Sequence, residues 1–271
     1  MYIGIDTGGT KTLLAVLNDD GIITEEIKFA TPDDYQEYLK QLSQKAKLIK
    51  AQDFKAGGLA IPATIIDRQS GIGKKYGNLA WLETPILRDV EKIFNCPFVL
   101  ENDAKLAALS EAMLLKDTFQ RVLYVTVSTG IGYGLVVNGK IDPNIGDGGG
   151  RTMLLENNGR LMPWEDFASG RAIVEKYGKK AEDIHDNTIW QKISADLAKG
   201  FIELIAICEP EVIVVGGGVG NYFERFETYL TKYIKDDSIP LIDMPVLMKA
   251  QRPDQAVVYG CYDLAKQVYG N

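Results

Sequence analysis

Six consecutive residues near the start of the chain have the composition of a phosphate-binding turn: Asp6, Thr7, Gly8, Gly9, Thr10 and Lys11. Because glycine has no Cβ, Gly8 and Gly9 can bring successive backbone N–H groups toward an anion. The Thr10 hydroxyl adds a donor, and Lys11 adds a positive charge. Asp6 ends a short apolar run, where its carboxylate would hold Mg²⁺ against the phosphates, directly or through water. The alternative is an ordinary hairpin turn.

A similar pattern recurs in the middle of the chain. Residues 2–14 align with residues 124–136 at a constant offset of 122, and four positions are identical: Tyr2/Tyr124, Thr7/Thr129, Gly8/Gly130 and Leu13/Leu135. Gly132 also belongs to the second turn, and the neutral Ser128 takes the place of Asp6. Two related halves, each with such a turn, predict a cleft in which two phosphate-binding turns face each other.

A third glycine cluster, Gly216, Gly217 and Gly218, follows the apolar run 212–215. If that run is a strand and residues 222–234 form a helix, the cluster lies at the carboxyl end of a strand, where ligands bind in α/β folds. A base or ribose could lie against this surface without side chains. The alternative is a tightly packed strand-to-helix turn.

Two polar residues, Asn102 and Asp103, lie between a predicted strand over 98–101 and a predicted helix over 104–115. The Asp103 carboxylate can accept the proton of a substrate hydroxyl while that oxygen attacks a γ-phosphate. Asn102 can hold a neighbouring hydroxyl. The alternative is that Asp103 only caps its helix, because Asp is a preferred N-cap residue.

Other chemistries fail on residue type or spacing. Gly4 and Gly9 have the Walker A interval, but Thr10 stands where lysine is required, and no glycine cluster satisfies G-x-G-x-x-G. The one histidine, His185, lies in a polar stretch and is expected to be solvated. No C-x-x-C pair or H-x-x-x-H spacing favours zinc.

The elements that must position these residues alternate between strand and helix. Strands are expected over 2–6, 12–17, 22–29, 58–61, 98–101, 123–127, 134–137 and 212–215. Helices are expected over 33–50, 85–94, 104–115, 188–208, 222–234 and 255–268. The glycine-rich stretch 142–151 is predicted to be a mobile or closely approached loop.

Composition limits the location and the partners of the protein. The chain has 271 residues and a net charge of −7, which disfavours binding to nucleic acid or to an anionic membrane. Its three cysteines are far apart, as expected in a reducing compartment. The first residues resemble no signal peptide, and no apolar run is long enough to span a membrane. We therefore expect a cytoplasmic protein.

Six motifs together resemble the ROK family of sugar kinases, within the actin-like and hexokinase-like ATPase superfamily: residues 6–11, 58–62, 101–104, 128–134, 167–170 and 214–218. The resemblance implies an α/β fold of two actin-like (ribonuclease H-like) lobes with a duplicated core. The lobes would be residues 1–108, rejoined by the C-terminal helix 255–271, and residues 109–254. ATP, Mg²⁺ and a sugar would bind in the interlobe cleft, and a homodimer is expected.

The resemblance also assigns roles. Asp103 is the general base, Asn102 a sugar ligand, and the two turns match the phosphate loops, with residues 216–218 near the adenosine. The family's Gly-Glu-x-Gly-His motif reads Gly146-Asp-Gly-Gly-Gly150 here, so Asp147 replaces the sugar-binding Glu and Gly150 the His. Glu165 matches a later sugar-binding Glu. For Asp147 and Glu165 the alternative is plain surface charge.

The zinc-binding cysteines of the family are absent from the corresponding region, residues 157–162, so we expect no zinc site. The predicted activity is ATP-dependent phosphorylation of a primary hydroxyl of a monosaccharide or sugar derivative, as in glucokinases, fructokinases and N-acetylhexosamine kinases. Because the contacts to one end of the sugar are altered, glucose cannot be assumed. Two alternatives are a non-catalytic sugar- or nucleotide-binding regulator and a kinase or ATPase with a non-sugar acceptor.

Overall fold

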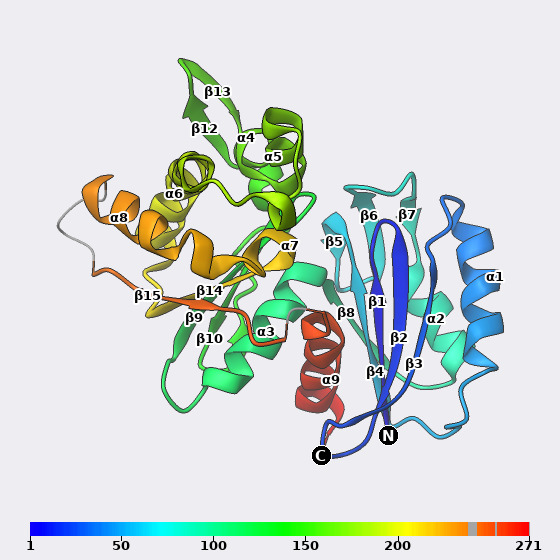
Figure 1. Ribbon diagram of the computed structural model, residues 1–271. Coiled ribbons are helices and arrows are strands. Elements are labelled where there is room, and N and C mark those ends of the chain that lie inside the picture. The colour runs from blue at the N-terminus through cyan, green and yellow to red at the C-terminus, as the bar shows by residue number, and fades with distance from the viewer. Residues whose placement is uncertain (238–242, 253, 271) are drawn as a thin grey trace. The chain divides into compact units, whose positions relative to one another are not determined.

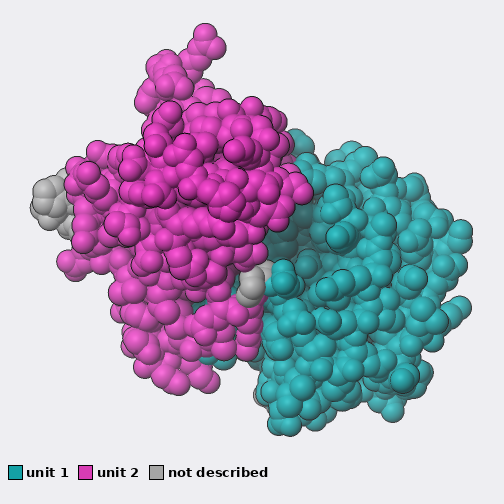
Figure 2. Space-filling model, viewed as in Figure 1, with its two compact units in different colours: residues 1–113, 254–271 teal, residues 114–253 magenta. Residues whose placement is uncertain are grey.

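The computed structural model describes residues 1–237, 243–252 and 254–270. The chain forms two compact units, residues 1–113 with 254–271 (unit 1) and residues 114–253 (unit 2), coloured separately in Figure 2. Residues 238–242 and 253 of the predicted second lobe, and residue 271 of the predicted C-terminal helix, lie outside the described residues. We describe each unit by itself.

Unit 1 is built on a five-stranded mixed sheet with the strand order β3-β2-β1-β4-β8 (Figure 1). Its strands are β1 (Tyr2–Thr7), β2 (Lys11–Leu17), β3 (Ile23–Ala30), β4 (Ala56–Ile61) and β8 (Phe98–Asn102). The first three form an antiparallel meander, and β1, β4 and β8 run parallel. Its helices are α1 (Tyr35–Ala46), α2 (Ile86–Phe94), α9 (Ala256–Tyr269) and α3 (Asp103–Leu115), which the boundary between the units crosses.

Both faces of this sheet are covered by helices, because successive side chains of a strand point to opposite faces. Ile3 and Ile5 of β1 belong to the core formed with α1 and α2. Tyr2 belongs to a separate cluster with Val258 and Tyr262 of α9. The parallel strands are therefore fixed from both sides, and their carboxyl ends meet at one edge of the sheet.

A small antiparallel sheet, which we did not predict, follows β4. It consists of β5 (Ala63–Asp67), β6 (Ile72–Tyr76) and β7 (Leu82–Thr84). Its strands are short and partly exposed, and one contains a register irregularity. The apolar alternation that marks a strand in a sequence is consequently weak here.

Unit 2 contains a second five-stranded sheet, in the order β11-β10-β9-β14-β15. Its strands are β9 (Arg121–Val127), β10 (Ile131–Val137), β11 (Lys140–Ile141), β14 (Val212–Gly216) and β15 (Val246–Lys249), and a separate hairpin joins β12 (Leu154–Asn157) to β13 (Arg160–Pro163). Its helices are α4 (Trp164–Ala168), α5 (Gly170–Tyr177), α6 (Asn187–Cys208), α7 (Gly217–Gly220) and α8 (Glu227–Asp237), with 3₁₀ turns at Gly149–Arg151, Ala181–Asp183 and Phe223–Arg225.

The two main sheets repeat one topology, which confirms the predicted α/β fold with a duplicated core. In unit 2, as in unit 1, an antiparallel meander continues into parallel strands through its first strand. The predicted residue-for-residue offset is wrong for Asp6 and Ser128, however. Asp6 lies within β1 opposite Leu13, whereas Ser128 follows the end of β9. The first hairpin closes with the pair Thr7–Thr12 and the second with Val127–Ile131, so the turns differ in length by one residue.

Most predicted elements are present, with ends shifted by a few residues. The helix expected over 33–50 is limited to α1, whose N-cap Asp34 accepts a hydrogen bond from the Glu37 N–H. The helix expected over 222–234 begins only at Glu227, because residues 223–225 form a 3₁₀ turn. The units divide within α3, the helix that also contains the predicted boundary at 108/109.

The one histidine lies where the sequence predicts, and the three cysteines are buried. Cys96, Cys208 and Cys261 are free and buried, and burial raises the thiol pKa of Cys96 and Cys208 to about 11. His185 is exposed. Within the part of the chain that the structure describes, no helix is both long enough and apolar enough to span a bilayer.

Gly260 allows α9 to pack closely on α3. A Cβ atom at this position would lie 1.9 Å from the Leu106 carbonyl oxygen. We expect Gly260→Ala to lower the free energy of unfolding by about 3 kcal/mol, because backbone atoms must move apart. Urea denaturation would measure the loss. The control is Gly146→Ala, whose Cβ has nothing within 4 Å, and equal stability losses in the two variants would contradict this view of the packing.

Candidate functional site

The register of unit 1 brings carboxylates to one edge of its sheet. Asp6 of β1 lies beside Ala60 of β4, and Ala60 lies beside Glu101 of β8. Two residues after Glu101 the chain enters α3 at Asp103. The predicted metal ligand and the predicted general base therefore lie at the same end of parallel strands that have β4 between them.

The Asp6 carboxyl titrates far from its usual range. Burial, and secondarily the negative charge of Asp103, raise its pKa to about 7. A carboxylate that is both desolvated and close to a second carboxylate favours a bound cation or a proton. Hard oxygen donors of this kind suit Mg²⁺, so the donor set fits the predicted ion.

Asn102, rather than Asp103, caps helix α3. Its Oδ1 accepts hydrogen bonds from the N–H groups of Ala104, at 3.0 Å, and Lys105, at 3.3 Å. Its Nδ2 donates to the Ala63 carbonyl oxygen at 3.2 Å, and the residue is only 5% exposed. Asp103 Oδ1 also accepts from Ala104 N, at 2.8 Å. Because Asn102 supplies the cap, the helix does not need Asp103 for that purpose.

An ion pair that the sequence did not suggest fixes the segment before Asp103. The Arg68 guanidinium donates to both carboxylate oxygens of buried Glu101, through Nε at 2.8 Å and through Nη2. Glu101 Oε1 also accepts the Asn102 N–H at 2.7 Å. Arg68 lies in the turn after β5, and its partner could not be inferred because the small sheet was not predicted.

The first glycine turn, residues 8–11, links β1 to β2. Gly8 N donates to the Lys11 carbonyl, and the Thr10 carbonyl accepts from Thr31 N, both at 3.0 Å. Gly9 packs on Asn78, since a Cβ at Gly9 would lie 2.9 Å from the Asn78 Cβ. The backbone of the turn is thus held on both sides, while Thr10 and Lys11 remain exposed.

In unit 2 the second turn and the third glycine cluster line one pocket of about 700 Å³. Ser128 and Thr129 contribute from the turn after β9, and Gly218 contributes from α7. Arg171, on the first turn of α5, and Tyr222 also line this pocket. The predicted phosphate and adenosine elements of this half therefore meet around one cavity.

Each glycine of the cluster after β14 has a different environment. A Cβ at Gly216 would lie 2.3 Å from the Tyr124 hydroxyl oxygen, and one at Gly217, which has φ +83°, would lie 2.5 Å from the Val127 carbonyl oxygen. Gly218 has nothing within 4 Å of such an atom. The first two glycines therefore allow close packing, and the third leaves the pocket open.

Glu165 is not a surface charge. It is 5% exposed. Its Oε2 accepts the Ile131 N–H at 3.0 Å, and its Oε1 accepts Arg151 Nη2 at 3.0 Å and Nε at 3.3 Å. Arg171 Nη2 lies 3.7 Å from Oε1. The carboxylate thus lies between two arginines and the backbone that follows the second glycine turn.

The stretch 142–151 approaches the second turn closely through its glycines. Gly149 has φ +55°, and a Cβ there would lie 2.3 Å from the Ile131 carbonyl oxygen. A Cβ at Gly150 would lie 2.9 Å from the Ile131 Cβ, so no side chain fits at this position without movement. Asp147 is half-buried in the turn just before.

Among residues 1–237, 243–252 and 254–270, no three His, Cys, Asp or Glu side chains are grouped to hold a metal ion.

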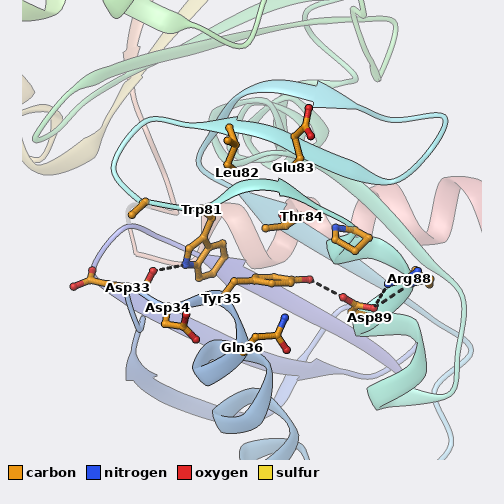
Figure 3. A pocket seen from close by; sticks show the side chains of 12 residues that line it. Asp33, Asp34, Tyr35, Gln36, Trp81, Leu82, Glu83, Thr84, Arg88 and Asp89 are labelled. Carbon is orange, nitrogen blue, oxygen red and sulfur yellow. Dashed lines mark hydrogen bonds and ion pairs between the residues drawn. The ribbon is translucent and has the colours of Figure 1, made fainter.

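A second pocket of about 670 Å³ belongs to unit 1 and contains none of the predicted site residues (Figure 3). It lies where α1 and α2 begin. The Tyr35 hydroxyl donates to Asp89 Oδ2 at 3.0 Å, and Trp81 Nε1 donates to the Asp33 carbonyl at 2.9 Å (Figure 3). These polar groups satisfy one another, so the pocket gives no indication of a ligand.

Comparison with known proteins identifies relatives along almost the whole chain. A sequence profile described as the ROK family matches residues 2–268. The N-acetyl-D-glucosamine kinase of Haemophilus influenzae (strain 86-028NP) is 28% identical over 301 residues, which cover 96% of this chain and 97% of the relative. The N-acetylmannosamine kinase of Escherichia coli O127:H6 (strain E2348/69 / EPEC) is 30% identical over 261 residues, covering 85% and 88% of the two chains.

A solved structure supports the same fold. A ROK family glucokinase from Streptomyces griseus, in complex with glucose and AMPPNP, superposes with a TM-score of 0.82 and 21% identity. The match covers 98% of this chain and 99% of the glucokinase. At this level of identity the likeness concerns the fold.

The raised pKa of Asp6 has a consequence for the ligand-free protein. The pKa of Asp6 is about 4 in the unfolded chain and about 7 in the folded chain. The folded state therefore becomes less stable as the pH rises from about 4 to 7, because it must lose a proton that it binds more tightly than the unfolded chain does. We expect Asp6→Asn to raise Tm by about 5 °C at pH 8, in EDTA and without nucleotide, and to have little effect at pH 4.

Differential scanning calorimetry at the two pH values would measure this difference. The control is Asp19→Asn, because Lys55 lowers the pKa of the exposed Asp19 carboxyl. Its loss removes a weak stabilising interaction at pH 8, so its Tm should fall slightly or stay unchanged. A fall in Tm for Asp6→Asn at pH 8 would contradict the raised pKa of Asp6.

Proposed function

The chain belongs to the ROK family, and from that premise we propose that it is an ATP-dependent carbohydrate kinase in which Asp103 is the general base. It would transfer the γ-phosphoryl group of ATP to a primary hydroxyl of a monosaccharide or sugar derivative. The observation that carries the proposal is the position of Asp103: it lies at the carboxyl edge of the sheet, within electrostatic range of Asp6, and Asn102 caps the helix in its place.

The role of Asp103 follows from its chemistry. A carboxylate accepts the proton of the attacking hydroxyl, which raises the electron density on that oxygen while the bond to phosphorus forms and the bond to ADP breaks. The Arg68–Glu101 ion pair supports this role, because it fixes the strand end that leads into Asp103. It also neutralises a carboxylate that would otherwise add to the repulsion between Asp6 and Asp103.

The unit 2 pocket is our proposed nucleotide site. Its size of about 700 Å³ suits a nucleotide-sized ligand. Thr129, Gly130 and Gly132 would bind phosphate oxygens in this half, as Gly8, Gly9, Thr10 and Lys11 would in unit 1. Residues 216–218 would lie against the adenosine.

Asp6 would hold Mg²⁺, directly or through water, and the bound ion would neutralise charge on the ATP phosphates. The acceptor would contact Asn102 and Asp147 as well as Asp103. Glu165 stays a predicted sugar ligand, although both of its oxygens already accept protein hydrogen bonds. Because Gly150 has no side chain, the acceptor is not assumed to be glucose. A cytoplasmic location and a homodimer also stay predictions.

The general base can be tested by kinetics. With a sugar panel and Mg-ATP, we expect ADP release to depend on one class of sugar, and Asp103→Asn to lower kcat about 10²–10⁴-fold with little change in ATP affinity. The matched control is Asp117→Asn, in the loop after α3. Turnover by Asp103→Asn close to that of the unchanged enzyme would disprove the base, and sugar binding without ADP release would favour a regulator.

The nucleotide pocket can be tested at Gly218. Because a side chain there projects into open space, we expect Gly218→Leu to fold normally but to raise the KM for ATP about tenfold or more, with an unchanged KM for the sugar. Gly217→Ala should instead lower Tm, since its φ of +83° and the Val127 carbonyl oppose a Cβ. An unchanged KM for ATP in Gly218→Leu would place the nucleotide elsewhere.

A further inference from the structure

The second glycine turn is held by a buried carboxylate rather than by its own hairpin alone. Glu165 Oε2 accepts the Ile131 N–H at 3.0 Å, and Ile131 is the first residue of β10. Gly130 packs directly on this carboxylate, since a Cβ there would lie 2.3 Å from Oε2. A change in the position of Glu165 would therefore move the turn.

Glu165 in turn depends on Arg151. A carboxylate that is 5% exposed is costly to bury unless it is paired and hydrogen-bonded. Arg151 places Nη2 at 3.0 Å and Nε at 3.3 Å from Oε1, whereas Arg171 lies 3.7 Å away and is also shared with Asp166 and Glu175. Arg151 is therefore the main counter-ion.

The backbone beside Arg151 closes on the same turn from another side. Gly149 lies against the Ile131 carbonyl, and Gly150 lies against the Ile131 side chain and the Glu165 backbone N–H. The turn is consequently held between residues 149–151 and α4, with the Arg151–Glu165 pair joining the two. One segment therefore contacts the turn through Gly149 and Gly150 and also supplies the arginine that pairs with the Glu165 carboxylate.

We propose that the Arg151–Glu165 ion pair is a positioning device for the phosphate-binding turn, residues 128–130, so that both residues govern nucleotide affinity without contacting the nucleotide. The inference rests on the proposed function. In this inference Glu165 holds the turn in position whether or not a sugar is bound. Arg151, which follows the glycine where the family pattern has histidine, acts in the same way through Glu165.

The test is ADP affinity without sugar, measured by isothermal titration calorimetry in Mg²⁺ buffer. Arg151→Gln and Glu165→Gln should each weaken ADP binding about tenfold or more, because each removes a charged hydrogen bond. The double variant should bind about as well as either single variant, since the two residues act as one unit. Arg151→Lys, which keeps the charge but not the two-point contact, should be intermediate.

The matched control is Arg160→Gln, which makes the same change at an exposed position of β13. Its ADP affinity and its Tm should equal those of the unchanged protein. Arg151 is partly exposed, so its variants should also keep Tm within a few degrees. Thermal denaturation of each variant shows whether a weaker affinity comes from the turn or from unfolding, and a loss of affinity matched by global unfolding counts against the proposal.

Further results would also overturn the inference. Unchanged ADP affinity in Glu165→Gln, together with a raised KM for the sugar, would make Glu165 a sugar ligand only. Additive losses in the double variant would show that the residues act separately. If the unchanged protein binds neither ADP nor ATP, the proposed function fails and the inference fails with it, whereas equal affinities in all proteins overturn the inference alone.

Discussion

The burial of one carboxylate, Asp6, within electrostatic range of a second, Asp103, is the constraint around which unit 1 is arranged. The sheet order places β1 and β8 on either side of β4, so two carboxylates lie at one edge of the sheet. Burial of Asp6 and, secondarily, the negative charge of Asp103 raise the Asp6 pKa to about 7. The surroundings limit the cost. Asn102 takes over the helix cap, and Arg68 neutralises Glu101. What remains is an edge that favours a positive charge, in keeping with the proposed Mg²⁺ site.

The two copies of the topology have different chemistry at equivalent hairpins. In unit 1 the hairpin strand contains the Asp6 carboxylate, while in unit 2 the corresponding turn opens onto a pocket with Thr129 and Gly218. In unit 2 the buried Glu165 carboxylate packs against the turn, where it accepts hydrogen bonds from the Ile131 N–H and from Arg151. The same backbone topology thus carries a buried carboxylate at the hairpin of unit 1 and an open pocket at the hairpin of unit 2.

Long periodic elements could be read from the sequence, because burial on a sheet or against a helix leaves a regular apolar pattern. The helix over 188–208 and the strand over 212–215 are examples. The small β5-β6-β7 sheet could not be read, since its short, exposed strands lack that pattern. Candidate residues such as Asp103 and Gly218 follow from local spacing. The partners of Glu101 and Glu165 do not, because Arg68 and Arg151 reach them only through tertiary packing.

The three buried thiols allow the opening of each unit to be measured chemically. Only a thiolate reacts readily with maleimides or hydrogen peroxide, and burial keeps the Cys96 and Cys208 thiols protonated at neutral pH. Cys261 lies in α9, against β1, so it becomes reachable only when that helix detaches. Alkylation rates therefore record how often each unit opens, with Cys96 and Cys261 reporting on one and Cys208 on the other.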